Sequence, residues 1–459
     1  MEMVAVESET SKPHVAVLPS PGMGHFIPLF EFAKRLVVHH DIHVSFLQIT
    51  TEASVAQNQL LHSSTLPPGL DVIDLAPANI SALVSEETLL LSRLCIIVQE
   101  SLRSLKSVLI ELGKPQALVI DLFSTQAFEI CRELSIPTYT FFTTSIAFLA
   151  FSLYLPTLDR EVDCEFVDLP EPIQVPGCTP VRTEDLLDQV RNRKIDEYKW
   201  FLLHISRLPM AAGIFLNSWE DLEPTSLKAI KDHIFYRQIP TPPVHPIGPL
   251  IKQAEASVTE TDAECLAWLD KQSSDSVLLI SLGSGGTLTA AQLTELAWGL
   301  ELSQQRFILV VRKPSDASAS GTFFNVGGDI NDPTAYLPEG FLERTEGVGL
   351  VVPSWVPQSI THGVPMIAWP LYAEQRMNAT MLVEDVGVAI KPVAVPGKEI
   401  VEREEIERVV RMVMEGEEGK AMRRKARELK DSAVEALRDT TGSSYESLSR
   451  VVKEWKLEA

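Results

Sequence analysis

The sequence predicts an α/β protein with two domains, the first built on a doubly wound parallel sheet. Three observations support this fold class. Short apolar runs alternate with segments of helical spacing near the amino terminus, the alternation resumes after residue 276, and a proline-rich stretch separates the two series. The length of 459 residues also exceeds what one typical hydrophobic core contains. We therefore expect two domains of roughly 200 residues each.

The first series has the order strand, loop, helix, strand. "HVAVLPSP" is a short apolar run that ends in proline and glycine, "FIPLFEFAKRLVVHH" has helical spacing, and "HVSFLQI" is strand-like again. "ALVIDLF" predicts another buried strand, followed by the helical "STQAFEICREL", and "IPTYTFFTT" repeats the pattern. These segments begin, in the same order, at His14, Phe26, His43, Ala117, Ser124 and Ile136.

The proline-rich stretch Ile239 to Leu250 predicts a linker between the two domains. After it, residues 276–286 predict a strand that runs into a glycine loop, and a helix and a second strand follow up to residue 312. Residues 313–336 are rich in Ser, Gly and Asp, which favours a mobile surface loop. The charged, periodic segments 402–416 and 420–437 indicate amphipathic helices.

Composition excludes several classes of protein. The net charge of −22 disfavours non-specific binding to nucleic acid or to an anionic membrane. The acidic, polar start does not have the pattern of a signal peptide, and the longest apolar stretch, Thr140 to Pro156, is too short and too polar for a membrane span. Five widely spaced cysteines without a CxxC pair indicate a reducing compartment and no zinc site. We expect a cytoplasmic protein.

Two residues at predicted strand ends are candidates for acid–base chemistry. His25 follows a Gly-x-Gly turn at the start of a helix, where it is either a general base or a helix-start histidine without a catalytic partner. Asp121 ends an apolar run, where it is either a turn or capping residue or the carboxylate that orients His25. Such a pair needs no covalent nucleophile, because the carboxylate stabilises the imidazolium that forms when the ring takes a proton.

Three further motifs are weaker. The glycine loop "SLGSGGT", which contains Ser284, could receive a phosphate on its backbone amides, but it is neither GxGxxG nor a P-loop. Trp355 could stack on a base or act as an ordinary hydrophobic anchor. Glu374 and Gln375 could hold several hydroxyls of a sugar, or they could be a solvated helix start.

Together these pieces resemble one family, the plant UDP-dependent glycosyltransferases of glycosyltransferase family one, and within it the hydroquinone and monolignol glucosyltransferases. The resemblance covers nearly the whole chain. It is carried, in order, by "SPGMGHFIP", "LVIDLF", "FLNSWEDLEP", "PIGPL", "SLGSGGTLT", "WVPQ" and "GVPMIAWPLYAEQRMNA".

The resemblance implies the GT-B fold, in which two Rossmann-like doubly wound domains face a cleft. Residues 1–245 would bind the acceptor, and residues 246–439 would bind the UDP-sugar. A last helix within residues 440–459, from Ser444 to Trp455, would cross back to the first domain. The family acts on small molecules as a metal-free enzyme with a UDP-sugar as co-substrate, so we expect no cofactor. We also expect a monomer.

The family's residues map onto matching positions here. His25 would take the proton of an acceptor hydroxyl, Asp121 would support it, and the oxygen would attack the anomeric carbon of an α-linked donor to give a β-glucoside. A final glutamine in the signature favours glucose as the transferred sugar. The resemblance implies donor contacts at Ser20, Ser284, Trp355, Val356, Gln358, Glu374 and Gln375. An acceptor pocket would use Phe123, Phe142 and Phe148, although phenylalanines in this apolar segment could equally be core.

One part of the family's signature is missing. The stretch from Trp355 to Gln375 spans 21 residues here, and about 23 residues of the family pattern are absent between Gln358 and Ser359. The absent block normally supplies a helix, a strand and "HCGWNSxLE", whose side chains hold the diphosphate and the ribose. Its removal predicts weaker donor binding and two unpaired strand edges in the second sheet. His362 is a poor replacement, because in register it belongs to the helix that follows.

Two hypotheses therefore stand. The main one is a UDP-glucose-dependent O-glucosyltransferase of small phenolic acceptors, with activity impaired by the missing block. The alternative is a catalytically dead binding protein that keeps the acceptor pocket. A nicotinamide-dependent oxidoreductase is disfavoured, because no GxGxxG with a following acidic residue is present.

Overall fold

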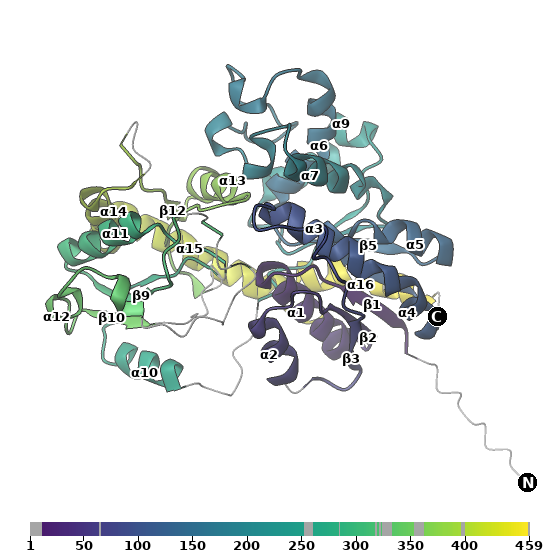
Figure 1. Cartoon of the computed structure of the whole chain (residues 1–459), viewed down its shortest axis with the longest axis horizontal. Helices are drawn as coiled ribbons and strands as arrows, with labels where there is room; N and C mark the ends of the chain where they lie inside the picture. The colour runs from purple at the N-terminus through teal and green to yellow at the C-terminus, as the bar shows by residue number, and fades with distance from the viewer. Residues whose placement is uncertain are drawn as a thin grey trace, which may run out of the picture.

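The computed structural model describes residues 12–63, 66–251, 260–283, 285–316, 319–320, 323, 333–352, 362–395 and 400–457. It consists of an N-terminal region (residues 12–251) and a C-terminal region (residues 260–442), which lie next to each other, and a final helix that runs back along the N-terminal region (Figure 1). Among the described helices, none is both long enough and apolar enough to cross a membrane.

The N-terminal region is built on one sheet of seven parallel strands in the order β3-β2-β1-β4-β5-β6-β7. Chain order changes direction at β1, whose neighbours are β2 and β4, so the carboxyl ends of β1 and β4 lie side by side. The predicted doubly wound parallel sheet is thus confirmed. The strands are β1 (His14–Leu18), β2 (His43–Ile49), β3 (Leu70–Leu75), β4 (Ala117–Asp121), β5 (Thr138–Phe142), β6 (Ile214–Leu216) and β7 (Val244–Pro246).

Helices cover both faces of this sheet and produce two hydrophobic clusters, one on each side. Alternate residues of β1 belong to different clusters: Val15 and Val17 to one, Ala16 and Leu18 to the other. This is the pattern of a parallel strand that is buried on both faces. The helices are α1 (Met23–His40), α2 (Val55–Ser63), α3 (Leu90–Ser101), α4 (Leu105–Glu111), α5 (Ala127–Leu134), α6 (Ile146–Glu161), α7 (Asp196–Ser206), α8 (Pro224–Asp232) and α9 (Ile234–Gln238).

The proline-rich stretch predicted as a linker contains a strand. β7 pairs with β6 alone and therefore forms an edge of the sheet. An edge strand tolerates proline because one of its sides needs no hydrogen-bond donors. Most of the predicted mobile loop, residues 313–336, lies outside the described residues, and its last part forms a short 3-10 helix at Pro333–Tyr336.

The C-terminal region has the same βα rhythm, and its described strands form two separate sheets. One holds three parallel strands in the order β10-β9-β8, and the other holds β11 and β12. The strands are β8 (Val277–Ile280), β9 (Arg306–Val310), β10 (Gly349–Val352), β11 (Met366–Ile367) and β12 (Ala389–Ile390). The helices are α10 (Glu260–Leu269), α11 (Ala290–Ser303), α12 (Phe341–Arg344), α13 (Gln375–Thr380), α14 (Arg403–Glu415) and α15 (Glu417–Ala436).

The two C-terminal sheets end at β8 and β11, and no hydrogen-bonded pairing joins these strands within the described residues. Leu278 and Ile280 of β8 and Ile367 of β11 nevertheless pack against the same hydrophobic cluster. All four residues of β8 and both residues of β11 are only partly buried. By contrast, every residue of β4 and β5 is buried.

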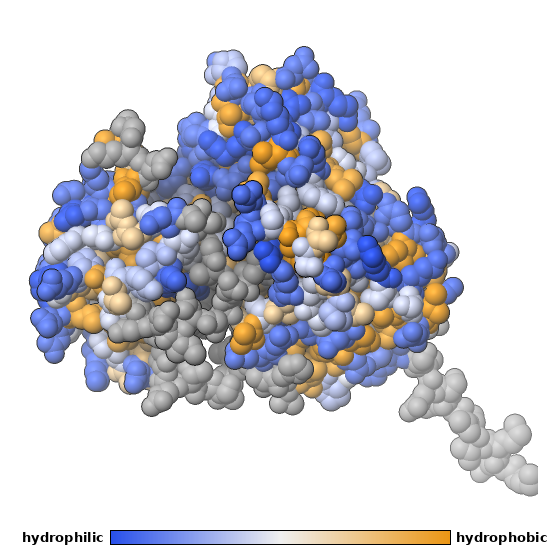
Figure 2. All heavy atoms as spheres, viewed as in Figure 1, coloured by the Kyte–Doolittle hydropathy of each residue, from blue (hydrophilic) through white to orange (hydrophobic). Residues whose placement is uncertain are grey.

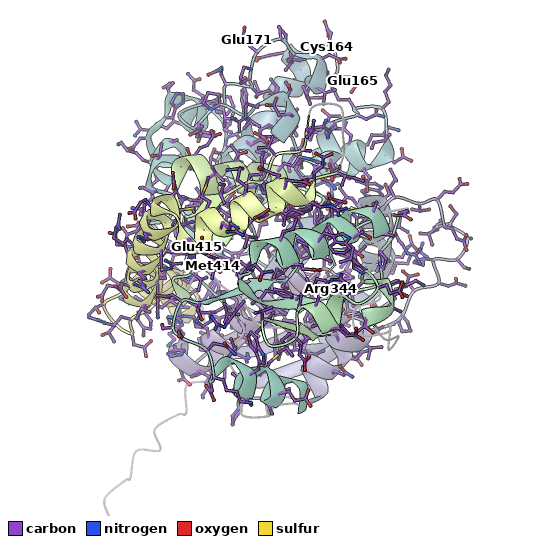
Figure 3. The ribbon with its side chains drawn as sticks, turned by 90° about the vertical axis from the view of Figure 1, so that its left-hand side faces the viewer. Cys164, Glu165, Glu171, Arg344, Met414 and Glu415 are labelled. Carbon is purple, nitrogen blue, oxygen red and sulfur yellow. The ribbon has the colours of Figure 1, made fainter. Side chains whose placement is uncertain are left out.

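Outer helices stabilise the C-terminal region. α11 and α14 run side by side across the face shown in Figure 3, where Met414 and Glu415 mark the end of α14. Glu415 accepts a hydrogen bond of 2.6 Å from the Gln305 side chain, and Arg344 at the end of α12 pairs with Glu301 of α11 at 2.8 Å. Polar residues cover most of the face shown in Figure 2, in keeping with the high charge of the chain.

The final helix, α16 (Ser443–Leu457), packs against the N-terminal sheet. Figure 1 shows the chain crossing from the C-terminal region to the side of β1 and α4, where it ends. The Trp455 ring meets the rings of Tyr139 and Phe215 edge-on, with ring centroids 5.4 and 6.1 Å away. The hydroxyl of Ser444 donates to the carbonyl of Gly248 at 2.7 Å. The helix Ser443–Leu457 therefore lies against the N-terminal region.

Candidate active site

The candidate site forms where β1 and β4 end. Gly22 caps the start of α1 with a φ of 103°, a left-handed conformation that side chains rarely adopt. A Cβ at this position would also lie 2.3 Å from the Phe323 ring. The backbone amides of His25 and Phe26 both donate to the Gly22 carbonyl. This turn brings His25 over the end of β4, whose last residue is Asp121.

His25 and Asp121 form a hydrogen-bonded pair. His25 Nδ1 lies 2.7 Å from Asp121 Oδ1, and Asp121 is fully buried. The other carboxylate oxygen accepts from the Ser20 hydroxyl at 2.6 Å and from the Phe123 backbone amide at 3.0 Å. Each oxygen of this buried carboxylate therefore has a donor, and the charge can be kept in the interior.

Electrostatics favour the charged form of both members. Burial alone would lower the pKa of His25, but the charge and the hydrogen bond of Asp121 outweigh it and raise that pKa. Burial alone would raise the pKa of Asp121, but the charge of His25 and the hydrogen bonds from His25, Phe123 and Ser20 lower it. A histidine whose imidazolium is stabilised in this way accepts a proton readily, as a general base must.

The ring of His25 has one engaged and one free nitrogen within the described part of the chain. Nδ1 is bound to Asp121, and the Thr143 hydroxyl lies 3.3 Å from the same atom. No hydrogen bond to Nε2 is found among the described residues. The side chain is 20% exposed. The nitrogen opposite Asp121 is therefore the one that can meet an acceptor hydroxyl.

The predicted acceptor-pocket residues fall into two groups. The ring of Phe123 lies beside the His25 ring, with centroids 5.3 Å apart, and is partly buried. Phe142 and Phe148 are core residues with exposed fractions of 0% and 3%, and their rings pack against each other. The structure thus brings only Phe123 of this set to the base, and a role of the other two in binding an acceptor stays a prediction.

Glu374 reaches this site from the C-terminal region. It precedes α13, and its charge contributes to the raised pKa of His25 across the boundary between the regions. Burial raises the pKa of Glu374, the charge of His25 opposes that rise, and Asn378 Nδ2 donates to its carboxylate at 3.3 Å. Gln375 Oε1 accepts from the Leu371 amide at 2.8 Å, which fixes the side chain beside Glu374.

The structure describes only some of the other predicted donor residues. Ser20 is fully buried, and its hydroxyl donates to Asp121, so here it supports the carboxylate of the pair. Its predicted contact with the donor stays untested. His362 is exposed, and the residues on both sides of the signature gap, Gln358 and Ser359, lie outside the described residues. Four further predicted donor residues lie outside the described residues: Ser284, Trp355, Val356 and Gln358.

Two α/β regions that meet at a histidine–aspartate pair are consistent with a glycosyltransferase of the GT-B class, and a solved structure of this class supports the assignment. The structure of TcCGT1 in complex with UDP matches with a TM-score of 0.90 and 44% identity over 98% of this chain and 100% of that one. The predicted GT-B fold is therefore confirmed.

The family follows from sequence relatives that match along nearly their whole length. Anthocyanidin 3-O-glucosyltransferase 5 of Manihot esculenta is 44% identical over 97% of this chain and 96% of its own. Hydroquinone glucosyltransferase of Rauvolfia serpentina is 43% identical over 97% of this chain and 98% of its own. Residues 354–438 also match the family described as UDP-glucoronosyl and UDP-glucosyl transferase. The chain belongs to this family of UDP-glycosyltransferases.

Thr143 is a residue of the site that sequence reasoning missed. It directly follows β5, the strand next to β4, so the rule that found His25 and Asp121 could also have found it.

Proposed function

We propose that this protein is an inverting O-glucosyltransferase that transfers glucose from UDP-glucose to small phenolic acceptors. The observation that carries the proposal is the pair of partly buried His25 and fully buried Asp121, in which Nδ1 is bound to the carboxylate and the opposite nitrogen has no hydrogen bond to any described residue. Two relatives, an anthocyanidin 3-O-glucosyltransferase and a hydroquinone glucosyltransferase, support a flat phenol as the acceptor.

The reaction follows from the orientation of the ring. The phenol donates its hydroxyl proton to Nε2 of His25, and Asp121 stabilises the imidazolium that results. The phenolic oxygen forms a bond to the anomeric carbon of glucose while the bond from that carbon to the diphosphate oxygen breaks. UDP leaves with the electron pair of the broken bond. Attack from the face opposite UDP converts an α-linked donor into a β-glucoside.

The donor contacts belong to the C-terminal region in this proposal. Glu374 and Gln375 hold hydroxyls of the glucose, and the position of Glu374 near His25 supports this assignment. The nucleoside and diphosphate contacts are assigned to Ser284, Trp355, Val356 and Gln358. UDP-glucose is then a co-substrate, and no step requires a metal.

The absent block of about 23 residues is part of the proposal. The proposal places the absent residues between β10 and β11. The interruption of the second sheet between β8 and β11 supports a missing strand at this place. The alignment with the Manihot relative also spans 471 positions, more than the 459 residues of this chain. We therefore expect weaker donor binding than in a full-length relative.

The interrupted sheet also favours a second candidate function. A chain that keeps the N-terminal site and has lost its donor clamp would bind phenols without transferring sugar. Titration calorimetry with UDP separates the two candidates. Micromolar binding supports the enzyme, whereas binding of hydroquinone without binding of UDP supports the binding protein.

A transfer assay with the His25→Ala variant tests the enzyme directly. The product of UDP-glucose and hydroquinone should be a β-glucoside, and its rate of formation should fall by about 10²–10⁴, the usual cost of losing a general base. A thermal melt serves as the control, because it shows whether the variant is still folded at the assay temperature. A variant that works within about tenfold of the parent would remove His25 as the base.

A monomeric state and a cytoplasmic location remain predictions of this proposal. The prediction of the location rests on five widely spaced cysteines without a CxxC pair, which indicate a reducing compartment.

A further inference from the structure

The loop before α13 carries a backbone conformation that needs support. Ala373, directly before Glu374 and Gln375, has a φ of 54°, in the left-handed region that favours glycine. A residue with a Cβ stays in this conformation only when its surroundings hold it there. The position of the two side chains that follow therefore depends on what holds Ala373.

Asp188 of the N-terminal region supplies that support. It begins a short 3-10 helix, Asp188–Val190, and binds both backbone groups of Ala373. The Ala373 amide donates to Asp188 Oδ2 at 2.9 Å, and the Asp188 amide donates to the Ala373 carbonyl at 3.3 Å. The remaining carboxylate oxygen, Oδ1, accepts from Arg376 on the first turn of α13.

The segment that carries Asp188 is packed into the N-terminal region. Its neighbours Leu186, Leu187 and Val190 are buried in the hydrophobic cluster of the N-terminal region, so Asp188 is anchored to the same body as His25. Asp185 on the preceding turn pairs with Lys391 at 3.1 Å across the same boundary. The contact between Asp188 and Ala373 thus links the loop before α13 to the N-terminal region.

A second contact reaches Glu374 from the other side. The hydroxyl of Ser145, which caps the start of α6, donates to Asn378 Oδ1 at 3.2 Å, and Asn378 Nδ2 donates to Glu374 Oε1 at 3.3 Å. Glu374 therefore lies between two attachments to the N-terminal region. Both attachments come from the body that carries the catalytic pair.

We propose that Asp188 is a positioning residue that sets the place of Glu374 and Gln375 relative to His25, and thereby the fit of the transferred sugar. The inference rests on the proposed function, because it assigns the sugar to Glu374 and Gln375. Asp188 touches neither the sugar nor His25 in this scheme. It acts through the backbone of Ala373, so its loss should weaken recognition of the glucose and leave that of the UDP moiety unchanged.

The test compares UDP with UDP-glucose. Titration calorimetry is done on the parent, on the near-isosteric Asp188→Asn and on Asp188→Ala. We expect UDP-glucose affinity to fall roughly tenfold or more in Asp188→Ala, the scale of one lost charge-assisted hydrogen bond, and less in Asp188→Asn. UDP affinity should stay within about twofold, because UDP lacks the hexose that the positioned side chains hold. Asp196→Asn is the matched control, since Asp196 pairs with Lys199 on the exposed face of α7.

Amide hydrogen exchange adds a readout that needs neither ligand nor turnover. The peptide that covers residues 371–376 should exchange faster in Asp188→Ala than in the parent, because the Ala373 amide loses its acceptor. Unchanged exchange, or equal losses of UDP and UDP-glucose affinity, would overturn the role of Asp188. A parent that binds neither ligand overturns the proposed function and the sugar-positioning role with it. A parent that binds both, with variants that bind as the parent does, overturns the role of Asp188 alone.

Discussion

The two sheets of this protein share a βα rhythm and differ in continuity. In the N-terminal region seven strands pair without interruption, and β4 and β5 are buried at every residue. In the described residues of the C-terminal region the strands divide into a sheet of three and a sheet of two, and β8 and β11 are only partly buried. The region that carries His25 and Asp121 thus has one continuous sheet, whereas the region assigned to the donor has two strand edges that face no pairing partner among the described residues.

The difference shows that the pair of His25 and Asp121 depends on fewer strands than a nucleotide-binding site does. The pair of His25 and Asp121 needs only two adjacent strand ends, which one intact sheet provides. A nucleotide site is assembled from loops that follow several strands, so the loss of one interior strand removes contacts and misplaces others. In the proposed function, such a loss would lower donor affinity and leave the geometry of His25 and Asp121 unchanged.

Restoring the absent block should produce the largest effect. Insertion of a relative's 23 residues between Gln358 and Ser359 should join β8 and β11 through a new interior strand and supply the phosphate and ribose contacts. We expect UDP-glucose affinity to rise on the order of a thousandfold, because three or four charge-assisted contacts are regained. Calorimetry and transfer to hydroquinone measure the gain. A shorter chain that already binds and transfers as well would contradict this explanation of the interrupted sheet.

Two leucine-to-alanine substitutions, one in each sheet, should show that a leucine of β8 contributes less to stability than a leucine of β4. Leu118 in β4 is fully buried, whereas Leu279 in β8 is only partly buried. Leu118→Ala should cost about 2–5 kcal/mol, and Leu279→Ala about half of that or less, because less apolar surface is removed from contact. Scanning calorimetry should then show a shift in melting temperature that is at least twice as large for Leu118→Ala. Equal shifts would mean that β8 is as well covered as β4.

The pH dependence that arises from His25 and Asp121 should be the same whether or not the second sheet is interrupted. Because Asp121 raises the pKa of folded His25 above the ordinary value of 6.5, the stability that the pair contributes is fully present below pH 6.5. That stability is lost as the pH rises through the raised pKa. Over the same interval the ring becomes neutral, so kcat/KM should rise about tenfold per pH unit and then level off.

Asp121→Asn sharpens this prediction. Without the carboxylate charge, burial dominates and should lower the pKa of His25, so the inflection should move to a more acidic pH. An NMR titration of the His25 ring protons measures the shift even when turnover is slow. An inflection that stays in place would show that Asp121 does not set the basicity of His25.

The sequence alone was enough to predict the site residues whose position depends on the order of the strands. His25 and Asp121 were predicted because they follow strands β1 and β4, and parallel strands bring their carboxyl ends to one edge. The absent block and the unpaired strand edges were predicted from the family resemblance, and they stay predictions. The inference about His25 and Asp121 uses the rules of parallel sheets and needs no knowledge of how the regions dock.

The support of the Glu374 loop could not be predicted in this way. Asp188 and Ala373 are far apart in the sequence, and their contact exists only after the two regions meet. An alanine with a positive φ also has no sequence signature, unlike the glycine at position 22. For Phe142 and Phe148, an apolar segment indicates burial but does not tell a pocket wall from a core.

The position of α16 has a consequence for how the protein is made. Leu448, Val451, Val452 and Trp455 belong to the same hydrophobic cluster as Val15 and Val17 of the first strand. Because α16 comes after both regions in the chain, the N-terminal region leaves the ribosome before the helix that packs on its Tyr139 and Phe215 rings. The folding of the first region is thus completed by a segment translated after the C-terminal region, and a nascent chain that stalls before Ser443 leaves these two rings without Trp455.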